Sequence, residues 1–130
     1  MPRQRNTRQR QAIEHVIEGL QRPLSPQEVL IEAKQEVPNL GLATVYRALN
    51  DMVIDGLLDR VDIPGQPPRY ERSGLNHHHH FHCSHCDKVF DLEGCLLKKD
   101  LSLPEGFSLE SHEVTLKGCC PDCNSAAKHS

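Results

Sequence analysis

The stretch 77–86 reads HHHHFHCSHC, and it decides how the second half of the chain folds. It ends in a Cys-x-x-Cys pair, Cys83 and Cys86, and a second pair, Cys120 and Cys123, follows with 33 residues between. This spacing lets four thiolates surround one Zn²⁺ as a tetrahedral, chemically saturated site. The cysteines therefore predict a structural zinc site. A redox role for the pairs would need a βαβ pattern, which the sequence lacks.

The histidines before Cys83 exceed what this zinc site needs, and imidazole binds transition metals well. In an extended strand, alternation places His77 and His79 on one face and His78 and His80 on the other. One strand could then serve two further metal sites. A solvated polar loop is the alternative, and an affinity tag would normally lie at a terminus. Ligand type alone does not choose among zinc, iron, manganese and nickel.

Acidic residues and one more histidine are candidate partners for the run, although each carboxylate alone is more commonly a surface group. A first set would join the two halves of the chain: Glu71, His78, His80 and Asp91. A second set would lie within the second half: His77, His79 and His112, with Glu93 or Cys95.

The first half of the chain predicts three amphipathic helices, at residues 7–21, from Pro26 to before Pro38, and at 42–55. Ser25 suits the N-cap of the second helix, and Glu28 completes a capping box. After the third helix, Gly56 is a C-terminal stop signal.

A β-hairpin follows these helices, with strands at 57–62 and 69–72 around Pro64-Gly65-Gln66-Pro67. Three helices and a hairpin predict a winged helix-turn-helix, whose last helix enters the DNA major groove. A generic helical domain with a hairpin is the alternative. The segment 73–76 resembles a hinge, so the predicted domains are 1–74 and 75–130.

The second domain predicts strands at 79–84 and 88–92 on either side of the Cys83 turn. A short helix is expected at 94–102, and one more extended segment runs through 107–116 and delivers Cys120. The predicted fold class is thus α+β.

Charge is unevenly distributed. Residues 1–74 contain ten Lys or Arg and ten Asp or Glu, whereas residues 75–130 contain five and eight. Four arginines precede the first acid, Glu14: Arg3, Arg5, Arg8 and Arg10. Such an arm can neutralise DNA phosphates, and a solvated basic terminus is the alternative.

The beginning of the chain lacks the apolar stretch of a secretory signal, and no run approaches the ~18 apolar residues of a membrane span. We therefore expect a cytoplasmic protein with no membrane partner, in which cysteines are thiols or metal ligands.

These motifs resemble the ferric uptake regulator (Fur) family of bacterial metal-dependent repressors. Residues 41–49, GLATVYRAL, resemble its recognition helix, and residues 77–89 resemble its metal-binding core. His112, Gly118 and the second cysteine pair match its C-terminal pattern. The resemblance implies a winged-helix domain, a small α/β dimerisation domain with a four-cysteine zinc site, and a homodimer that binds operator DNA when metal is present.

The resemblance also implies roles for individual residues. Tyr46 and Arg47, with Thr44 on the same helix, would contact the DNA groove, and Arg10 would contact a phosphate. The interdomain sensory metal site would consist of Glu71, His78, His80 and Asp91. His77, His79 and His112 match a second metal site. The segment between Asp91 and His112 is shorter than usual in the family, so the resemblance assigns no carboxylate to this site, and Glu93 is the candidate from the residues alone.

Two departures from the family pattern bear on the regulatory metal. Pro23 stands where many relatives have a sensory histidine, and His79 stands where iron-type members often have Asp. The His-rich core is most similar to the zinc uptake branch, because nitrogen ligands favour zinc-type coordination. Zinc is thus the expected regulatory metal, and iron, manganese or peroxide sensing are the alternatives.

Functions of other classes fit less well. A zinc buffer or chaperone explains the histidines but not the 41–49 motif or the basic arm. A zinc deaminase needs His-x-Glu and Pro-Cys-x-x-Cys, whereas His112-Glu113 lacks the spacer and Pro121 lies inside the pair. A four-thiolate site also has no open position for a substrate. We therefore expect a metal-responsive repressor of metal homeostasis genes, not an enzyme.

Overall fold

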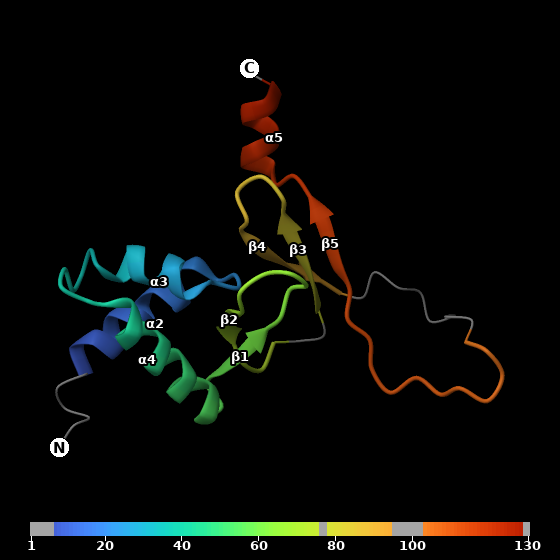
Figure 1. Cartoon of the computed structure of the whole chain (residues 1–130), viewed down its shortest axis with the longest axis horizontal. Coiled ribbons are helices and arrows are strands. Elements are labelled where there is room, and N and C mark those ends of the chain that lie inside the picture. Colours follow the sequence, from blue (N-terminus) through green and yellow to red (C-terminus); the bar gives the residue numbers. More distant parts are fainter. Residues whose placement is uncertain (1–6, 76–77, 95–102, 129–130) are drawn as a thin grey trace. The chain divides into compact units, whose positions relative to one another are not determined.

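The computed structural model describes residues 7–75, 78–94 and 103–128 (Figure 1). The chain divides into two compact units, Met1–Gly74 and Leu75–Ser130, and each is described by itself. Several sequence predictions fall outside the described residues: Arg3 and Arg5 of the basic arm, His77, Cys95 and nearly all of the helix expected at 94–102. No helix within the described ranges is long and apolar enough to cross a membrane.

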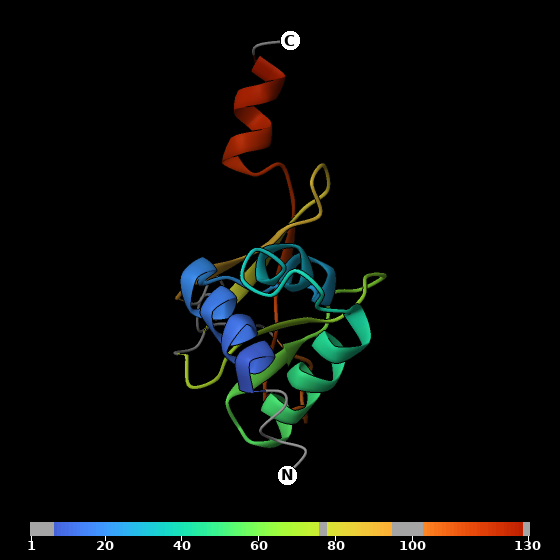
Figure 2. The same cartoon turned by 90° about the vertical axis from the view of Figure 1, so that its left-hand side faces the viewer.

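The first unit consists of three helices followed by a two-stranded hairpin. The elements are α2 (Thr7–Leu20), α3 (Pro26–Ala33), α4 (Leu42–Ile54), β1 (Leu58–Val61) and β2 (Arg69–Arg72). Figure 2 shows the three helices gathered side by side. Their apolar faces meet in one core that includes Ile13, Val29 and Leu49, all fully buried. The periodic apolar residues of the sequence are thus the residues that leave water.

α3 begins with the predicted capping box. The Ser25 hydroxyl accepts the Glu28 N–H at 3.1 Å, and the Glu28 carboxylate accepts the Ser25 N–H at 3.1 Å. The helix ends at Ala33, earlier than predicted. The chain turns there instead of continuing to Pro38, and this turn buries Val37 and Leu40 in the core.

The hairpin is bound to the helices through Tyr70. β1 and β2 pair antiparallel, from Leu58 opposite Arg72 to Val61 opposite Arg69. Tyr70 also exchanges two backbone hydrogen bonds of 2.9 Å with Leu24 in the α2–α3 linker. Its hydroxyl donates to Asn50 Oδ1 on α4 at 3.4 Å. One residue of the wing therefore contacts both the linker and the third helix.

The second unit is a small mixed sheet with a helix at its C-terminal end. Its elements are β3 (His78–Cys83), β4 (Val89–Glu93), β5 (Thr115–Gly118) and α5 (Pro121–Lys128). The strand order is β4-β3-β5, and β3 pairs antiparallel with β4 but parallel with β5. The α+β class is confirmed. The parallel pairing and α5 were not predicted, and the expected segment at 107–116 forms a strand only from Thr115 onward.

The register of this sheet separates two groups of side chains. His78 and His80 share a face with Asp91, because His80 lies directly opposite Asp91 and paired residues point the same way. His79 and Phe81 point to the opposite face. On that face Gly118 leaves room for the Phe81 ring, since a Cβ there would lie 3.1 Å from Phe81 Cζ.

Candidate metal centres and recognition helix

Four cysteines converge at one end of the second unit. Cys83 ends β3, Cys86 follows in the turn, Cys120 follows β5, and Cys123 lies in the first turn of α5. Their sulfur atoms all lie within 4.8 Å of one another, with Cys83–Cys123 at 3.7 Å and Cys86–Cys120 at 3.8 Å. Sulfurs about 2.3 Å from a tetrahedral Zn²⁺ would be separated by about 3.8 Å. The donor set and its spacing therefore fit zinc.

The pKa values of these thiols also indicate a place for a positive ion. Burial raises the pKa of Cys83, but backbone N–H donors from Cys86, Cys120 and His85 stabilise the thiolate and lower its pKa to about 5 overall. By contrast, burial and its sulfur neighbours raise the pKa of Cys86, and the pKa of Cys123 is raised chiefly by its hydrogen bond with Cys120. The Cys83 thiolate is favoured and the thiolates of Cys86 and Cys123 are not, because negative sulfurs this close repel one another without a central positive charge.

Backbone geometry holds the first cysteine pair in place. Cys83 N–H donates to Lys88 O, and Asp87 N–H donates to Cys83 O, each at 2.9 Å. Asp87 has φ +64°, the left-handed conformation that closes this turn. Its carboxylate lies 3.2 Å from Nε2 of the buried His82. His82 thus stabilises the turn between Cys83 and Cys86 from the adjacent strand position.

A second cluster lies on the His78 face of the sheet. His78 Nε2 lies 3.3 Å and His80 Nε2 lies 3.4 Å from the same oxygen, Oδ1 of Asp91. The two imidazole centroids are 4.9 Å apart, and all three side chains are about four-fifths buried. Two ring nitrogens and a carboxylate therefore converge on one point, a donor set that divalent transition metals accept. Glu71, the other predicted member, lies on β2 of the first unit.

The other histidines have a different environment. The rings of His79 and His112 lie 5.2 Å apart, and His79 is buried. Val114 N–H donates to His79 Nδ1 at 3.2 Å, so the proton of a neutral His79 ring resides on Nε2. A metal could bind His79 only if this arrangement changed. Glu93 pairs with His78 in the register and so lies on the face opposite His79.

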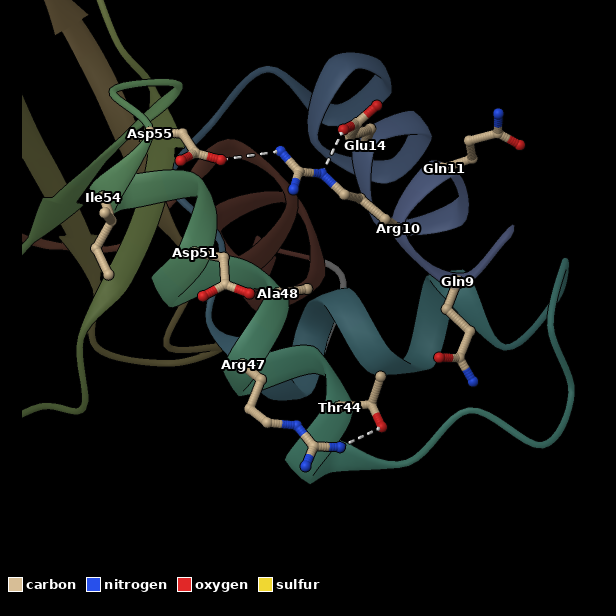
Figure 3. A pocket seen from close by; sticks show the side chains of 10 residues that line it. All are labelled: Gln9, Arg10, Gln11, Glu14, Thr44, Arg47, Ala48, Asp51, Ile54 and Asp55. Atoms are coloured by element: carbon tan, nitrogen blue, oxygen red, sulfur yellow. Dashed lines mark hydrogen bonds and ion pairs between the residues drawn. The ribbon is translucent and has the colours of Figure 1, made fainter. Parts of the chain in front are cut away.

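The predicted DNA-contacting residues lie on α2 and α4 of the first unit. Arg47 is exposed and donates to Thr44 Oγ1 at 3.3 Å, and Tyr46 is half-buried on the same helix. Arg10 is held by two carboxylates, Glu14 at 3.1 Å and Asp55 at 3.5 Å (Figure 3). The sequence predicted a basic arm free of acids before Glu14, and it gave no signal for the contact with Asp55, which is distant in the chain.

Comparisons with known proteins agree with this architecture. Residues 3–117 match the model of the Ferric uptake regulator family. The chain is 37% identical over 124 residues to the zinc uptake regulation protein of Mycobacterium tuberculosis, covering 93% of this chain and 95% of that protein. It is 30% identical over 123 residues to the ferric uptake regulation protein of Campylobacter jejuni, covering 91% and 78%.

A solved structure shares the fold. The ferric uptake regulator of Helicobacter pylori, which has three functional metal-binding sites, superposes with a TM-score of 0.65 at 24% identity, covering 92% of this chain and 81% of that one. The family model matches most of the chain, and the relatives match across nearly all of it. The chain described here is a member of the Ferric uptake regulator family.

Proposed function

We propose that this protein is a zinc-responsive transcriptional repressor that binds operator DNA as a homodimer and controls genes of metal homeostasis. The observation that carries the proposal is the convergence of His78, His80 and Asp91 on one point beside a separate four-cysteine cluster. A saturated thiolate site suits a permanent ion, whereas a site of nitrogen and oxygen donors suits an ion that is gained and lost.

In this proposal the four cysteines hold a structural zinc, which would supply the charge that makes four thiolates stable together. The chain's own contribution is a preformed set of donors. The backbone N–H groups of Cys86 and Cys120 stabilise the Cys83 thiolate, and the His82–Asp87 pair fixes the turn between the first two ligands. Hydrogen bonds of this kind, made to the ligand residues and not to the metal, orient the ligands and raise the affinity for the metal.

The sensed ion would bind His78, His80 and Asp91, with Glu71 from the wing as fourth ligand. Two nitrogens and two oxygens suit tetrahedral zinc, whereas iron and manganese commonly take more ligands. The α2–α3 linker supports a four-ligand set, because the Pro23 side chain has no donor atom, its carbonyl oxygen accepts from Arg22, and both Glu28 oxygens are engaged by Ser25 and Arg22. The 37% identity to a zinc uptake regulation protein favours the same metal.

If its ligands come from both units, the bound metal would restrict how the two units move relative to each other. Glu71 is adjacent to Tyr70, whose contacts reach Leu24 and Asn50. A bound ion would fix the winged-helix domain against the second unit, and in a dimer it would fix the separation of two α4 helices near one DNA turn, roughly 34 Å. Moving a population from 1:99 to 99:1 takes about 5.5 kcal/mol of differential metal affinity, which several ligand bonds can supply.

Dimerisation would use the second unit. β5 is an edge strand in the described sheet, and an unpaired edge readily accepts another chain. Leu116 on this strand is 42% exposed, and Phe107 and Leu109 in the preceding segment are 68% and 50% exposed. A second copy of the chain would cover these apolar side chains.

A second, weaker metal site at His79 and His112 would require a rearrangement of the His79 ring. The predicted partners were His77, which lies outside the described residues, and Glu93. To bind Nδ1 of His79, an ion would have to displace the Val114 N–H. To bind Nε2, it would have to replace the proton on that nitrogen, and the ring would have to shift.

Operator binding with and without metal tests the proposal. The protein is stripped of its labile ion with a mild chelator that leaves the cysteine-bound zinc, then titrated onto operator DNA at fixed salt with added zinc, iron(II) or manganese(II). We expect tight binding only with zinc. Equal affinity in the stripped and zinc-loaded states would contradict a metal switch, and a response to iron or manganese alone would reassign the sensed metal.

A further inference from the structure

Charges at two helix ends of the first unit stand where the helix dipole disfavours them. The first turn of α2 has no acidic residue and carries Arg8 and Arg10. The last turn of α4 has no basic residue, and Asp51 and the C-cap Asp55 lie at this end. Positive charge at a helix N-terminus and negative charge at a C-terminus both oppose the macrodipole. The helix dipole therefore does not account for these charges.

Three of these charged residues, Arg10, Asp51 and Asp55, line the groove between the two helices (Figure 3). Arg10 Nε lies 3.1 Å from Glu14 Oε1, and Arg10 Nη2 lies 3.5 Å from Asp55 Oδ2. Two carboxylates thus surround one guanidinium, so the local net charge is −1. The three side chains are 36%, 38% and 54% exposed, so a ligand arriving from solvent can reach them.

The other arginine of this groove is different. Arg47 donates to the neutral hydroxyl of Thr44, and it has no ion pair among the residues that the structure describes. Asp51 also lines the groove without an ion pair within those residues. The charge of Arg47 is therefore available to a ligand, whereas the charge of Arg10 is offset by two carboxylates. Asp51 lines the groove but takes no part in these ion pairs.

We propose that Asp55 and Glu14 guard Arg10, so that a DNA phosphate must replace these carboxylates before Arg10 can contact it. This inference rests on the proposed function, in which the first unit binds operator DNA, and on the expected contact of Arg10 with a phosphate. A carboxylate and a phosphate compete for the same planar guanidinium donors. The guard weakens the part of DNA binding that is independent of sequence. Stable binding then depends more on the α4 contacts with bases and on the second subunit.

A double-mutant cycle on the zinc-loaded full-length protein tests the guard. The variants are Asp55→Asn, the matched control Asp51→Asn, and each of these combined with Arg10→Gln. Asp51 and Asp55 lie one helical turn apart on α4, so both changes remove one negative charge from the same region. Affinity is measured by fluorescence anisotropy at low salt, on operator DNA and on a duplex of unrelated sequence.

Asp55→Asn should tighten binding to both duplexes by about two- to five-fold, the range of an exposed ion pair. In the Arg10→Gln background this gain should fall to the smaller gain of Asp51→Asn, which reflects only the removal of one negative charge and should be the same in both backgrounds. Arg10→Gln alone should make the slope of log affinity against log salt shallower by about 1. Thermal melts confirm folding, and Asn keeps the α4 C-cap while removing the unfavourable charge.

An Asp55→Asn gain that is undiminished in the Arg10→Gln background would overturn the guard, because it would reflect general charge repulsion. No gain at all would overturn it as well. If either result occurs in a protein whose operator binding still responds to zinc, the guard is wrong and the proposed function stands. Failure of the wild-type protein to bind any duplex would instead overturn the proposed function together with this inference.

Discussion

The two units bury different kinds of side chain. The first has a continuous apolar core, from Ala12 on α2 to Tyr70 on β2. Among the described residues of the second, Val89 is the one buried aliphatic or aromatic side chain, and the other buried positions are cysteines and histidines. The comparison indicates that the first unit is stabilised by apolar burial. We expect the second unit to depend on a bound metal, as small domains with little core commonly do.

The largest effect that tests this contrast is the loss of one thiolate. Cys86→Ser should abolish the tetrahedral site, and bound structural zinc contributes on the order of 10 kcal/mol to a domain this small. We expect about one zinc fewer per chain and rapid hydrogen exchange throughout residues 78–94 and 115–125, with the first unit still protected. Cys119→Ser is the control, since Cys119 adjoins Cys120 but lies outside the cluster. Normal zinc content in Cys86→Ser would contradict the assignment.

The complementary change acts on the apolar core. Leu49→Ala should destabilise the first unit by about 2–5 kcal/mol, because a fully buried leucine leaves a cavity when it is truncated. Zinc content and protection of the second unit should be unchanged. Ile54→Ala on the same helix is the control, because Ile54 is 81% exposed. Equal destabilisation of both units by Leu49→Ala would show that they fold as one.

The contrast extends to function, because DNA contact is expected from the first unit alone. Arg47→Ala should weaken operator binding by about 1–3 kcal/mol, the value of one specific base contact. Melting temperature and zinc content should stay the same. Lys34→Ala, which removes another exposed charge from the first unit, should have a smaller effect. An operator affinity unchanged by Arg47→Ala would remove this residue from the proposed interface.

Within the second unit, we expect that the sensory metal site can be weakened without loss of the structural one. His80→Ala should keep the cysteine-bound zinc and the fold, yet weaken binding of a second zinc by on the order of ten-fold or more. Competition with a chromophoric chelator measures both affinities. His85→Ala is the control, since His85 is an exposed residue of the turn between Cys83 and Cys86. An unaltered second affinity would exclude His80 as a ligand.

The smallest expected effect is a pH dependence confined to the first unit. The hydrogen bond with Glu36, at 3.0 Å, raises the pKa of His15 above its ordinary value of about 6.5. The protonated pair therefore stabilises the fold below about pH 6.5, and this contribution is lost as pH rises through the higher folded pKa. His15→Gln should flatten the melting temperature of the first unit across that range, and Glu36→Gln should do the same. A slope that persists in both variants would refute the assignment.

Much of this molecule follows from local sequence signals. The capping box of Ser25 and Glu28 fixes where α3 begins, and the apolar period fixes α2 and α4 within a residue or two. The two Cys-x-x-Cys pairs identify the four cysteines that lie together, because ligand spacing and zinc geometry leave few other arrangements. Each of these signals acts between residues close in the chain or through one ion of known geometry.

Other features depended on contacts between distant residues, which no local pattern encodes. The parallel pairing of β5 with β3 connects residues more than thirty positions apart, and the end of α3 at Ala33 reflects the burial of Val37 and Leu40. The convergence of His78 and His80 on one Asp91 oxygen follows from the β3–β4 register. The neutralisation of Arg10 by Asp55 arose from the packing of α2 beside α4. Sequence determined which chemical groups the protein has, and tertiary packing decided which of their charges and lone pairs are engaged.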